Sequence, residues 1–442
     1  MKSKKLMNAW QKREVLLENY TEDRKKLLLR PIHSIEIKEG VVVSGLEYAD
    51  AYSDQCTGGN ASDRLETYKL NTTEIYRGRQ CVIRGTVDGL KMKYTPGDSL
   101  LMWAPNSDEI VEVLMGLFNI KEDKCVQFRR IRCRDSSLIF SFSGRISGYF
   151  KYFLDITSIP SKLALFRLSQ YAEKNKDQLE YLSSKEGSGD YFALGRNWNT
   201  LIDILLQFRV KIPFEALLEV SKEIKPRAFS FINGEDDDCE FVAGILTDTE
   251  SPVRNGHFSD FLLRNTGNKA ETMGTSLIQK KFMDCIYRVK HKENNLFKLR
   301  SSSTVCLLFG IGTGVAPFIS FIRNCRKDCQ FTLFYGCKSS EENILVKTSI
   351  AHGKEHPSEY TGAFLLKTEC PNVEVHVVYS QTHLSIRMGE FLEKNAAQVQ
   401  KKCAELSLDG IYICGNKEAT KSISNYFAVN HPEVLLHSDD WS

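Results

Sequence analysis

The sequence predicts a multi-domain protein: a β domain interrupted by a helical insertion, followed by an α/β domain with a parallel sheet. Short β candidates bounded by turn residues occupy about 65–103 and return after Pro226. Between them, residues 146–224 carry apolar side chains at near-helical spacing. From Ser301 onward, apolar runs alternate with helical stretches, which is typical of a parallel sheet covered on both faces. The length of 442 residues agrees with about two to four domains.

Each element has a local signal. In the β domain, a turn at 94–100 leads into an apolar strand, and a helix is expected over 107–118. Residues 1–65 are polar and irregular, with a charged helical candidate at 8–29, and no chemistry is assigned to them. The further strands are expected at 226–233, 240–247, 304–309, 330–335, 373–379 and 410–413.

Composition excludes several classes of protein. Lys and Arg (59) nearly balance Asp and Glu (56), so the net charge of +3 provides no global field for nucleic acid or anionic lipid. The thirteen cysteines show no C-x-x-C spacing, so no structural metal is expected, and reduced thiols in the cytoplasm fit them better than a secreted disulfide framework. The uncharged stretch 305–322 contains too much glycine and proline for a membrane span.

The glycine-rich stretch 310–317 (G-I-G-T-G-V-A-P) follows an apolar strand and precedes a helix. Glycines allow backbone to approach a pyrophosphate, and a helix N-terminus directs unpaired N–H groups at it. Alone, the glycine pattern is equally typical of a tight turn, and Ala316-Pro317 replaces the third glycine of the usual G-x-G-x-x-G. The strand and helix around it favour nucleotide binding.

Two further segments suggest contacts with a phosphate or a ring. Arg227, Phe229 and Ser230 lie on a candidate strand, where an Arg could hold phosphate and an aromatic could stack. On that fragment alone, a surface Arg with ordinary strand alternation is the simpler interpretation. The stretch 256–259 (G-H-F-S) opens a helix and offers a second phosphate cradle.

The order P-R-A-F-S, G-x-x-S, G-x-G-T-G-V-A-P-F, L-F-Y-G-C, I-Y-I-C-G-N and a terminal D-x-W-S resembles the reductase half of the diflavin reductases. That family includes the NADPH–haemoprotein reductases and the cytosolic iron–sulfur assembly reductases. The resemblance covers about residues 66–442. It implies a ferredoxin-NADP-reductase-like antiparallel FAD barrel with a helical insertion (66–300, insertion at about 146–224) and an NAD(P)-binding α/β domain (301–442) after an N-terminal extension (1–65).

The resemblance also implies roles for individual residues. Arg227 would contact the FAD pyrophosphate, Phe229 would pack on the flavin and Ser230 would reach flavin N5. Cys414, Asp439 and Trp441 would complete the catalytic group, with Trp441 covering the isoalloxazine and Asp439 stabilising positive charge on the nicotinamide. The other residues assigned to FAD are Arg196, Ala228, Ala243, Gly244, Ile245, Gly256, His257, Phe258 and Ser259, and those assigned to NAD(P) are Gly310, Gly312, Thr313, Gly314, Ser380, Gln381 and Arg387.

Without the resemblance, the simpler interpretation is that Cys414 is a small buried side chain and that the terminal residues 439–442 fray. The sequence also departs from the family pattern. Only about 65 residues precede the matched region, whereas a flavodoxin-like domain needs roughly 150, so FMN is not expected on this chain. In the family, a Ser-Arg pair binds the 2′-phosphate of NADPH, and here the pair is Ser380-Gln381. Arg387 could supply the missing positive charge, whereas the negative charge of Glu390 disfavours phosphate binding. NADPH is the expected donor, and NADH remains a second possibility.

The expected function is a flavoprotein reductase. NADPH would reduce FAD, and electrons would pass to a separate FMN, haem or iron–sulfur protein. The alternative is a binding or scaffold protein that keeps the fold without turnover, which the altered 2′-phosphate residues motivate. Retention of Ser230, Cys414, Asp439 and Trp441 argues against the scaffold.

Overall fold

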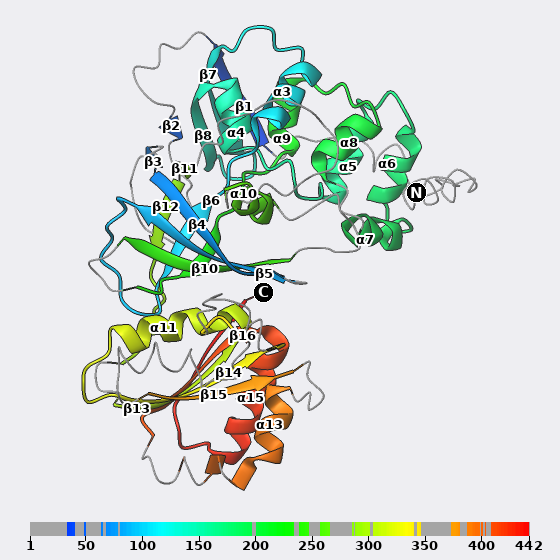
Figure 1. Cartoon of the computed structure of the whole chain (residues 1–442). Helices are drawn as coiled ribbons and strands as arrows, with labels where there is room; N and C mark the ends of the chain where they lie inside the picture. Colours follow the sequence, from blue (N-terminus) through cyan, green and yellow to red (C-terminus); the bar gives the residue numbers. More distant parts are fainter. Residues whose placement is uncertain are drawn as a thin grey trace, which may run out of the picture. The chain divides into compact units, whose positions relative to one another are not determined.

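The computed structural model divides into two compact units (Figure 1). One unit comprises Met1–Leu65 and Pro105–Lys225, and the other comprises Glu66–Ala104 and Pro226–Ser442. The structure describes residues 33–39, 48–49, 63–64, 68–77, 80–196, 200–233, 238–246, 257–265, 285–286, 288–300, 304–339, 343–345, 373–380, 387–397, 399–400, 403 and 408–441. The helical candidate at 8–29 therefore lies outside the described residues.

The first unit contains an antiparallel sheet in the order β1-β7-β8-β2-β3 (Figure 1). Alternate residues of β7 (Cys125–Arg132) point into a core of aromatic side chains, because successive side chains of a strand face opposite sides. Phe128 packs against the rings of Phe142 and Tyr149 at centroid distances of 5.5 and 5.0 Å. The other strands are β1 (His33–Glu39), β2 (Tyr48–Ala49), β3 (Asp63–Arg64) and β8 (Leu138–Arg145).

The described residues of this unit also form several helices. The expected helix at 107–118 is confirmed as α3 (Asp108–Leu117). The helices of the insertion all lie between residues 146 and 220. The compact unit has a second segment that begins at Pro105, however, and it includes the strand pair β7–β8, which the sequence did not predict. These helices are α4 (Ile146–Tyr152), α5 (Lys162–Ser169), α6 (Lys176–Ser183), α7 (Ser188–Arg196), α8 (Leu201–Gln207) and α9 (Phe214–Val220).

The second unit begins with two antiparallel sheets, ordered β10-β5-β4-β11 and β12-β6-β9. Their inner faces share a core that includes the fully buried residues Leu100, Met102, Phe231 and Phe241. Strands β9 and β10 match the two expected after Pro226. The strands are β4 (Tyr68–Arg77), β5 (Gln80–Asp88), β6 (Ser99–Trp103), β9 (Arg227–Ser230), β10 (Cys239–Leu246), β11 (Cys285–Ile286) and β12 (Arg288–Lys292), with α10 (His257–Asn265) between β10 and β11.

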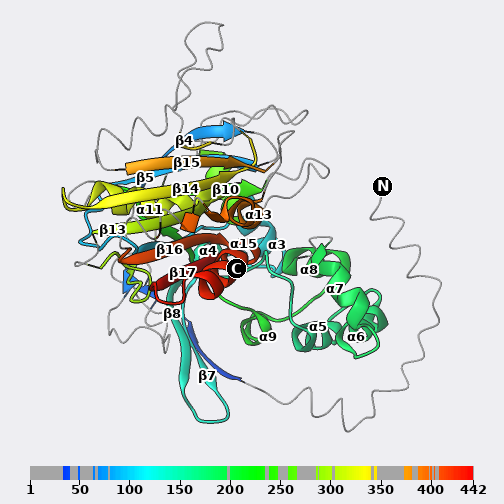
Figure 2. The same cartoon turned by 90° about the horizontal axis from the view of Figure 1, so that it is seen from below.

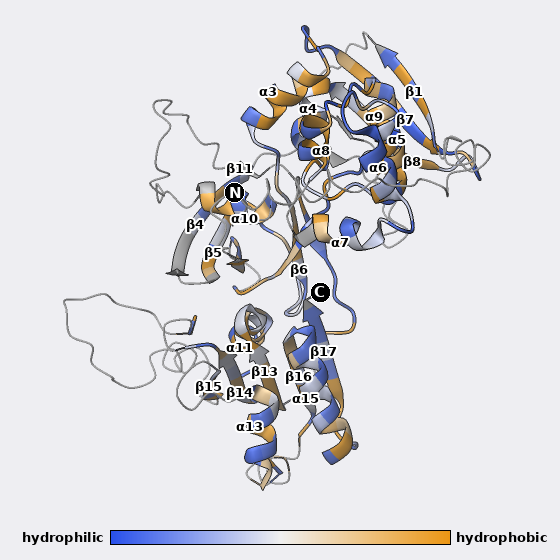
Figure 3. Cartoon of the chain, turned by 90° about the vertical axis from the view of Figure 1, so that its right-hand side faces the viewer, coloured by the Kyte–Doolittle hydropathy of each residue, from blue (hydrophilic) through white to orange (hydrophobic). Residues whose placement is uncertain are grey.

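The same unit ends with a parallel sheet in the order β15-β14-β13-β16-β17 (Figure 2). Apolar side chains of β13 alternate between two cores: Leu308 packs with α11, and Phe309 packs with α13 and α15. The helices carry hydrophilic and hydrophobic residues along their length (Figure 3). The elements are β13 (Val305–Ile311), α11 (Ala316–Arg323), β14 (Gln330–Cys337), β15 (Val373–Tyr379), α13 (Met388–Lys394), β16 (Gly410–Asn416), α15 (Lys417–Asn430) and β17 (Leu436–Trp441).

The fold class is thus confirmed: antiparallel β sheets, a helical insertion and a parallel α/β sheet covered on both faces. Among the described residues, no helix is both long and apolar enough to span a membrane. Nor do the described His, Cys, Asp and Glu side chains form a group that could hold a metal ion.

Candidate functional site

The glycine turn connects β13 to α11 through a short 3₁₀ segment, Gly312–Val315. Gly312 adopts a φ of 58°, which favours glycine. A Cβ on Gly314 would lie 2.4 Å from the carbonyl oxygen of Cys414, so only glycine fits this close approach to β16. No side chain caps the start of α11. Backbone N–H groups at a helix start of this kind can bind phosphate, and binding of a pyrophosphate by the glycine turn stays a prediction.

Cys414 and Asp439 meet at the carboxyl end of the parallel sheet. Strands β16 and β17 run parallel, and their register places Asp439 beside Cys414. On its other side, β16 pairs with β13, so that Cys414 lies beside Gly310 at the start of the glycine turn. The carboxyl ends of parallel strands are where open α/β sheets bind their ligands. Three residues predicted from separate motifs are therefore neighbours in space.

The Asp439 carboxylate has a mixed environment. Burial raises its pKa above the ordinary value, and Lys292 opposes that rise. Asp440 adds to the rise, whereas a hydrogen bond from Asn294 Nδ2 to Asp439 Oδ2, at 3.2 Å, favours the ionised form. The net pKa shift is upward. A carboxylate with a perturbed pKa at the end of a sheet is typical of a functional site.

Strand β9 presents the Arg227–Ser230 segment, which pairs with β6 so that Ser230 lies opposite Ser99. Arg227 and Ala228 are exposed, and no acidic side chain among the described residues pairs with the Arg227 guanidinium. That guanidinium can therefore bind an anion. Ser230 and Phe229 are buried, and the Phe229 ring lies 5.0 Å from each of the Phe241 and Phe258 rings.

The remaining residues assigned to FAD are dispersed over the barrel, apart from Arg196, which ends α7 in the other unit. Ala243 and Ile245 face the barrel core, and Gly244 between them is exposed on the outer face of β10. His257 begins α10 and its Nε2 lies 2.8 Å from the carbonyl oxygen of Ala104. Phe258 is buried and Ser259 is half-buried. Gly256, the side chain of Arg196 and the side chain of Trp441 lie outside the described residues.

The two described residues predicted to read the 2′-phosphate lie at strand and helix ends. Ser380 follows β15, and its backbone N–H donates to the carbonyl oxygen of Cys337 at 2.9 Å. Arg387 is exposed immediately before α13, and Glu390 is exposed in the first turn of that helix. Gln381 lies outside the described residues.

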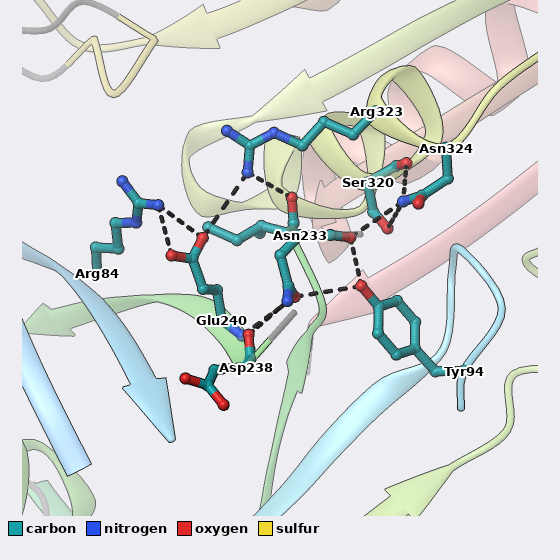
Figure 4. Close-up of polar contacts among 9 residues, drawn as sticks. Arg84, Tyr94, Asn233, Asp238, Glu240, Ser320, Arg323 and Asn324 are labelled. Carbon is teal, nitrogen blue, oxygen red and sulfur yellow. Dashed lines mark hydrogen bonds and ion pairs between the residues drawn. The ribbon is translucent and has the colours of Figure 1, made fainter. Parts of the chain in front are cut away.

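A polar junction joins the far end of α11 to the barrel (Figure 4). Arg323 donates to the carbonyl oxygen of Ile232 at 2.8 Å, and its guanidinium lies 3.8 Å from the Glu240 carboxylate. Asn324 Nδ2 donates to the carbonyl oxygen of Asn233 at 3.0 Å, and the Tyr94 hydroxyl donates to the same oxygen. The helix that begins at the glycine turn is thus held to the barrel at its other end. No motif in the sequence predicts this junction.

Sequence reasoning also missed Asp98 and Asn294. Asp98 lies in the turn predicted at 94–100, and the sequence predicted no contact for its carboxylate. Asn294 lies between β12 and β13 in a segment without a recognisable motif. Only the folded chain shows that its amide reaches Asp439.

Comparisons with known proteins agree with this architecture. The model of the FAD binding domain family matches residues 70–242, and that of the oxidoreductase NAD-binding domain family matches residues 308–425. A methionine synthase reductase from Mus musculus is 24% identical over 384 residues, covering 77% of this chain and 52% of its own length. An NADPH–cytochrome P450 reductase from Candida tropicalis is 23% identical over 382 residues, covering 80% of this chain and 54% of its own. The chain thus spans about half the length of these relatives.

Among solved structures, the ferredoxin-NADP+ reductase from Plasmodium falciparum with 2′P-AMP covers 85% of this chain and 95% of its own, at 13% identity and a TM-score of 0.43.

Proposed function

Because this chain belongs to the diflavin reductase family, of which it contains the FAD- and NAD(P)-binding half, we propose that it is an NADPH-dependent flavoprotein reductase. It would accept hydride from NADPH onto FAD and pass electrons to a separate acceptor protein. The observation that carries the proposal is the meeting of the glycine turn, Cys414 and Asp439 at one edge of the parallel sheet, in a unit that also holds the FAD-binding barrel.

The chain's own residues would bind and orient the two cofactors. Backbone N–H groups at the glycine turn would hold the nucleotide pyrophosphate, and Arg227 would hold the FAD phosphates. Bound FAD supplies the hydride-accepting ring. Asp439 in its ionised form would stabilise positive charge on the nicotinamide, while Ser230 and Cys414 would line the place where the two rings meet. Trp441 would cover the flavin when no nicotinamide is present.

Donor preference depends on the 2′-phosphate residues. Arg387 is exposed and would attract the phosphate, whereas Glu390 one turn along would repel it. We therefore propose NADPH as the preferred donor, with a smaller preference over NADH than a Ser-Arg pair would give. The ratio of the two KM values measures this preference, and equal values would refute it.

The acceptor is proposed to be a separate protein that carries FMN, haem or an iron–sulfur cluster. The two curated relatives are named as reductases of methionine synthase and of cytochrome P450. No disulfide joins the cysteines whose side chains the structure describes, which is compatible with the proposed cytoplasmic location.

An absorption spectrum of the purified protein tests the function directly. Flavin bands that bleach when NADPH is added without oxygen would support the reductase. Protein that stays colourless after incubation with FAD would instead favour the scaffold alternative, to which the Ser380-Gln381 departure points. Trp441→Ala adds a second test, because an unchanged hydride-transfer rate and an unchanged NADPH preference would remove the role proposed for the tail.

A further inference from the structure

Asn294 makes hydrogen bonds to both parts of the second unit. It lies in the described segment 293–300, which follows β12 of the barrel and precedes β13 of the parallel sheet. Its side-chain Nδ2 donates to Asp439 Oδ2 at 3.2 Å, and its backbone N–H donates to Asp98 Oδ1 at 2.9 Å. Its Oδ1 accepts from the backbone N–H of Phe297 at 3.1 Å, which closes a local turn. One residue therefore joins a barrel carboxylate to the carboxylate of the nucleotide domain.

Asp98 holds this segment from the barrel side. Its side chain is 1% exposed and accepts from the backbone N–H of Thr95 at 2.9 Å, from His291 Nε2 at 2.8 Å and from Lys298 Nζ at 3.3 Å. Burial alone would raise its pKa, but these hydrogen bonds and that from Asn294 lower it, so the carboxylate stays ionised. A buried carboxylate with this many donors is a rigid anchor.

The same anchor is connected to the strand that carries Ser230. Asp98 immediately precedes β6, whose first residue, Ser99, pairs with Ser230. The backbone N–H of Phe231 donates to the carbonyl oxygen of Asp98 at 3.4 Å. The Ser230 strand and the Asp439 strand, which supply the two ends of the proposed catalytic group, are thus linked through Asp98 and Asn294.

The other side of the segment packs on the parallel-sheet domain. The Phe297 ring lies 5.9 Å from Phe318 and 5.8 Å from Phe321 of α11, and 5.9 Å from Tyr412 of β16. The Tyr412 hydroxyl donates to the carbonyl oxygen of Lys298 at 3.2 Å. Held on both sides, the segment gives the Asn294 side chain one fixed direction, toward Asp439.

Resting on the proposed function, we propose that Asn294 is a positioning residue that holds the Asp439 carboxylate oriented and ionised for hydride transfer, with Asp98 fixing Asn294 in place. The groups that face Asp439 have opposing effects on its ionisation, so a hydrogen bond that favours the carboxylate is needed. Burial and Asp440 favour the protonated acid, and Lys292 and Asn294 favour the anion. A protonated Asp439 could not stabilise positive charge on the nicotinamide. The amide of Asn294 adds a directed hydrogen bond that the exposed Lys292 does not supply.

Asn294→Asp tests the proposal with little change in shape. The new carboxylate keeps an oxygen for the turn with Phe297 but replaces the donor to Asp439 by a like charge. The matched control is Asn295→Asp, the same charge change at an exposed neighbour for which no contact with Asp439 is found among the described residues. In stopped-flow flavin reduction, we expect Asn294→Asp to lower the hydride-transfer rate about tenfold at acidic pH and to recover at higher pH. Asn295→Asp should follow the wild-type pH profile.

A second readout does not depend on activity. In protein labelled with ¹³C at the aspartate carboxyls, the resonance absent from Asp439→Asn identifies Asp439. Its titration midpoint should lie at higher pH in Asn294→Asp than in the wild type and Asn295→Asp. Asn294→Ser keeps an oxygen for the turn, but its side chain is too short to extend to Asp439 as the amide does. It should shift the midpoint in the same direction even if Asn294→Asp folds poorly.

The outcomes separate this inference from the proposed function. Wild-type protein that binds FAD but is not reduced by NADPH would refute the function, and the NMR titration would still test the Asn294–Asp439 bond. Normal reduction together with an unshifted pH profile and an unshifted midpoint in both Asn294 variants would overturn the positioning role. An equal shift in Asn295→Asp would also overturn it, because a general charge effect would then be sufficient.

Discussion

Replacing Gly314 by alanine should damage the glycine turn and the stability of the nucleotide domain together. The added Cβ would lie 2.4 Å from the Cys414 carbonyl oxygen, 2.7 Å from its carbonyl carbon and 2.8 Å from Gly415 Cα. All three atoms belong to the backbone of β16, which is held by β13 on one side and β17 on the other. No side chain can therefore rotate away to relieve the contact.

The cost follows from that geometry. Ordinary contacts of a Cβ begin near 3.4 Å, so the turn or β16 would have to move by about one ångström. Overpacking of a rigid interior costs about 1–3 kcal/mol, and we expect the upper end because backbone must shift. With a urea m-value of about 3 kcal/mol per molar, the unfolding midpoint should fall by about 1 M. The displaced N–H groups should also weaken NADP⁺ binding about tenfold.

Urea unfolding and calorimetric titration with NADP⁺ measure the two effects. Gly116→Ala is the matched control, because Gly116 lies in the last turn of helix α3 and an added Cβ there would meet nothing within 4 Å. Alanine is the better helix former, so this change should stabilise slightly, by about 0.5–1 kcal/mol. A Gly314→Ala protein with the wild-type midpoint and wild-type NADP⁺ affinity would refute the reasoning, since the backbone contact would then relax at no cost.

Three further predictions concern charged residues. Asp439→Asn should lower the hydride-transfer rate about a hundredfold in stopped-flow measurements. Burial raises the pKa of the Asp439 carboxyl, so its favourable contribution to folding stability is lost as pH rises through the folded-state pKa. The variant should therefore have a higher urea midpoint than the wild type at neutral pH, but not at acidic pH. Asp98→Asn should destabilise the protein by about 2–3 kcal/mol at neutral pH. Because the Asp98 pKa is lowered in the folded state, the stability that its carboxylate contributes should be present above the unfolded-state pKa and disappear as pH falls through the folded-state pKa. A difference in urea midpoint between variant and wild type that does not change with pH would contradict this prediction. Arg227→Ala should weaken FAD binding about tenfold or more in fluorescence titrations, while Arg134→Ala, which removes an exposed arginine from the other unit, should leave it unchanged.

Local patterns in the sequence were sufficient to predict most of the fold. The parallel strands were recognisable because strands buried on both faces are continuous apolar runs, as in β14. The hairpin β7–β8 was missed for the opposite reason. In β7, buried and exposed residues alternate, and Arg129 and Arg132 are among the exposed ones, so this strand has no continuous apolar run. The short strand β17 gave no local signal either, and its pairing with β16 makes the strand.

The sequence by itself determined which chemistry-bearing residues are available. The glycine turn was readable because its function depends on a local backbone shape, and the terminal Asp-x-Trp-Ser was readable by resemblance. Tertiary structure decided which of these residues meet. The neighbouring positions of Gly310, Cys414 and Asp439 depend on the register of three parallel strands far apart in the chain. The contact of Asn294 with Asp439 spans 145 residues, and a hydrogen bond of this kind leaves no periodic or local trace in a sequence.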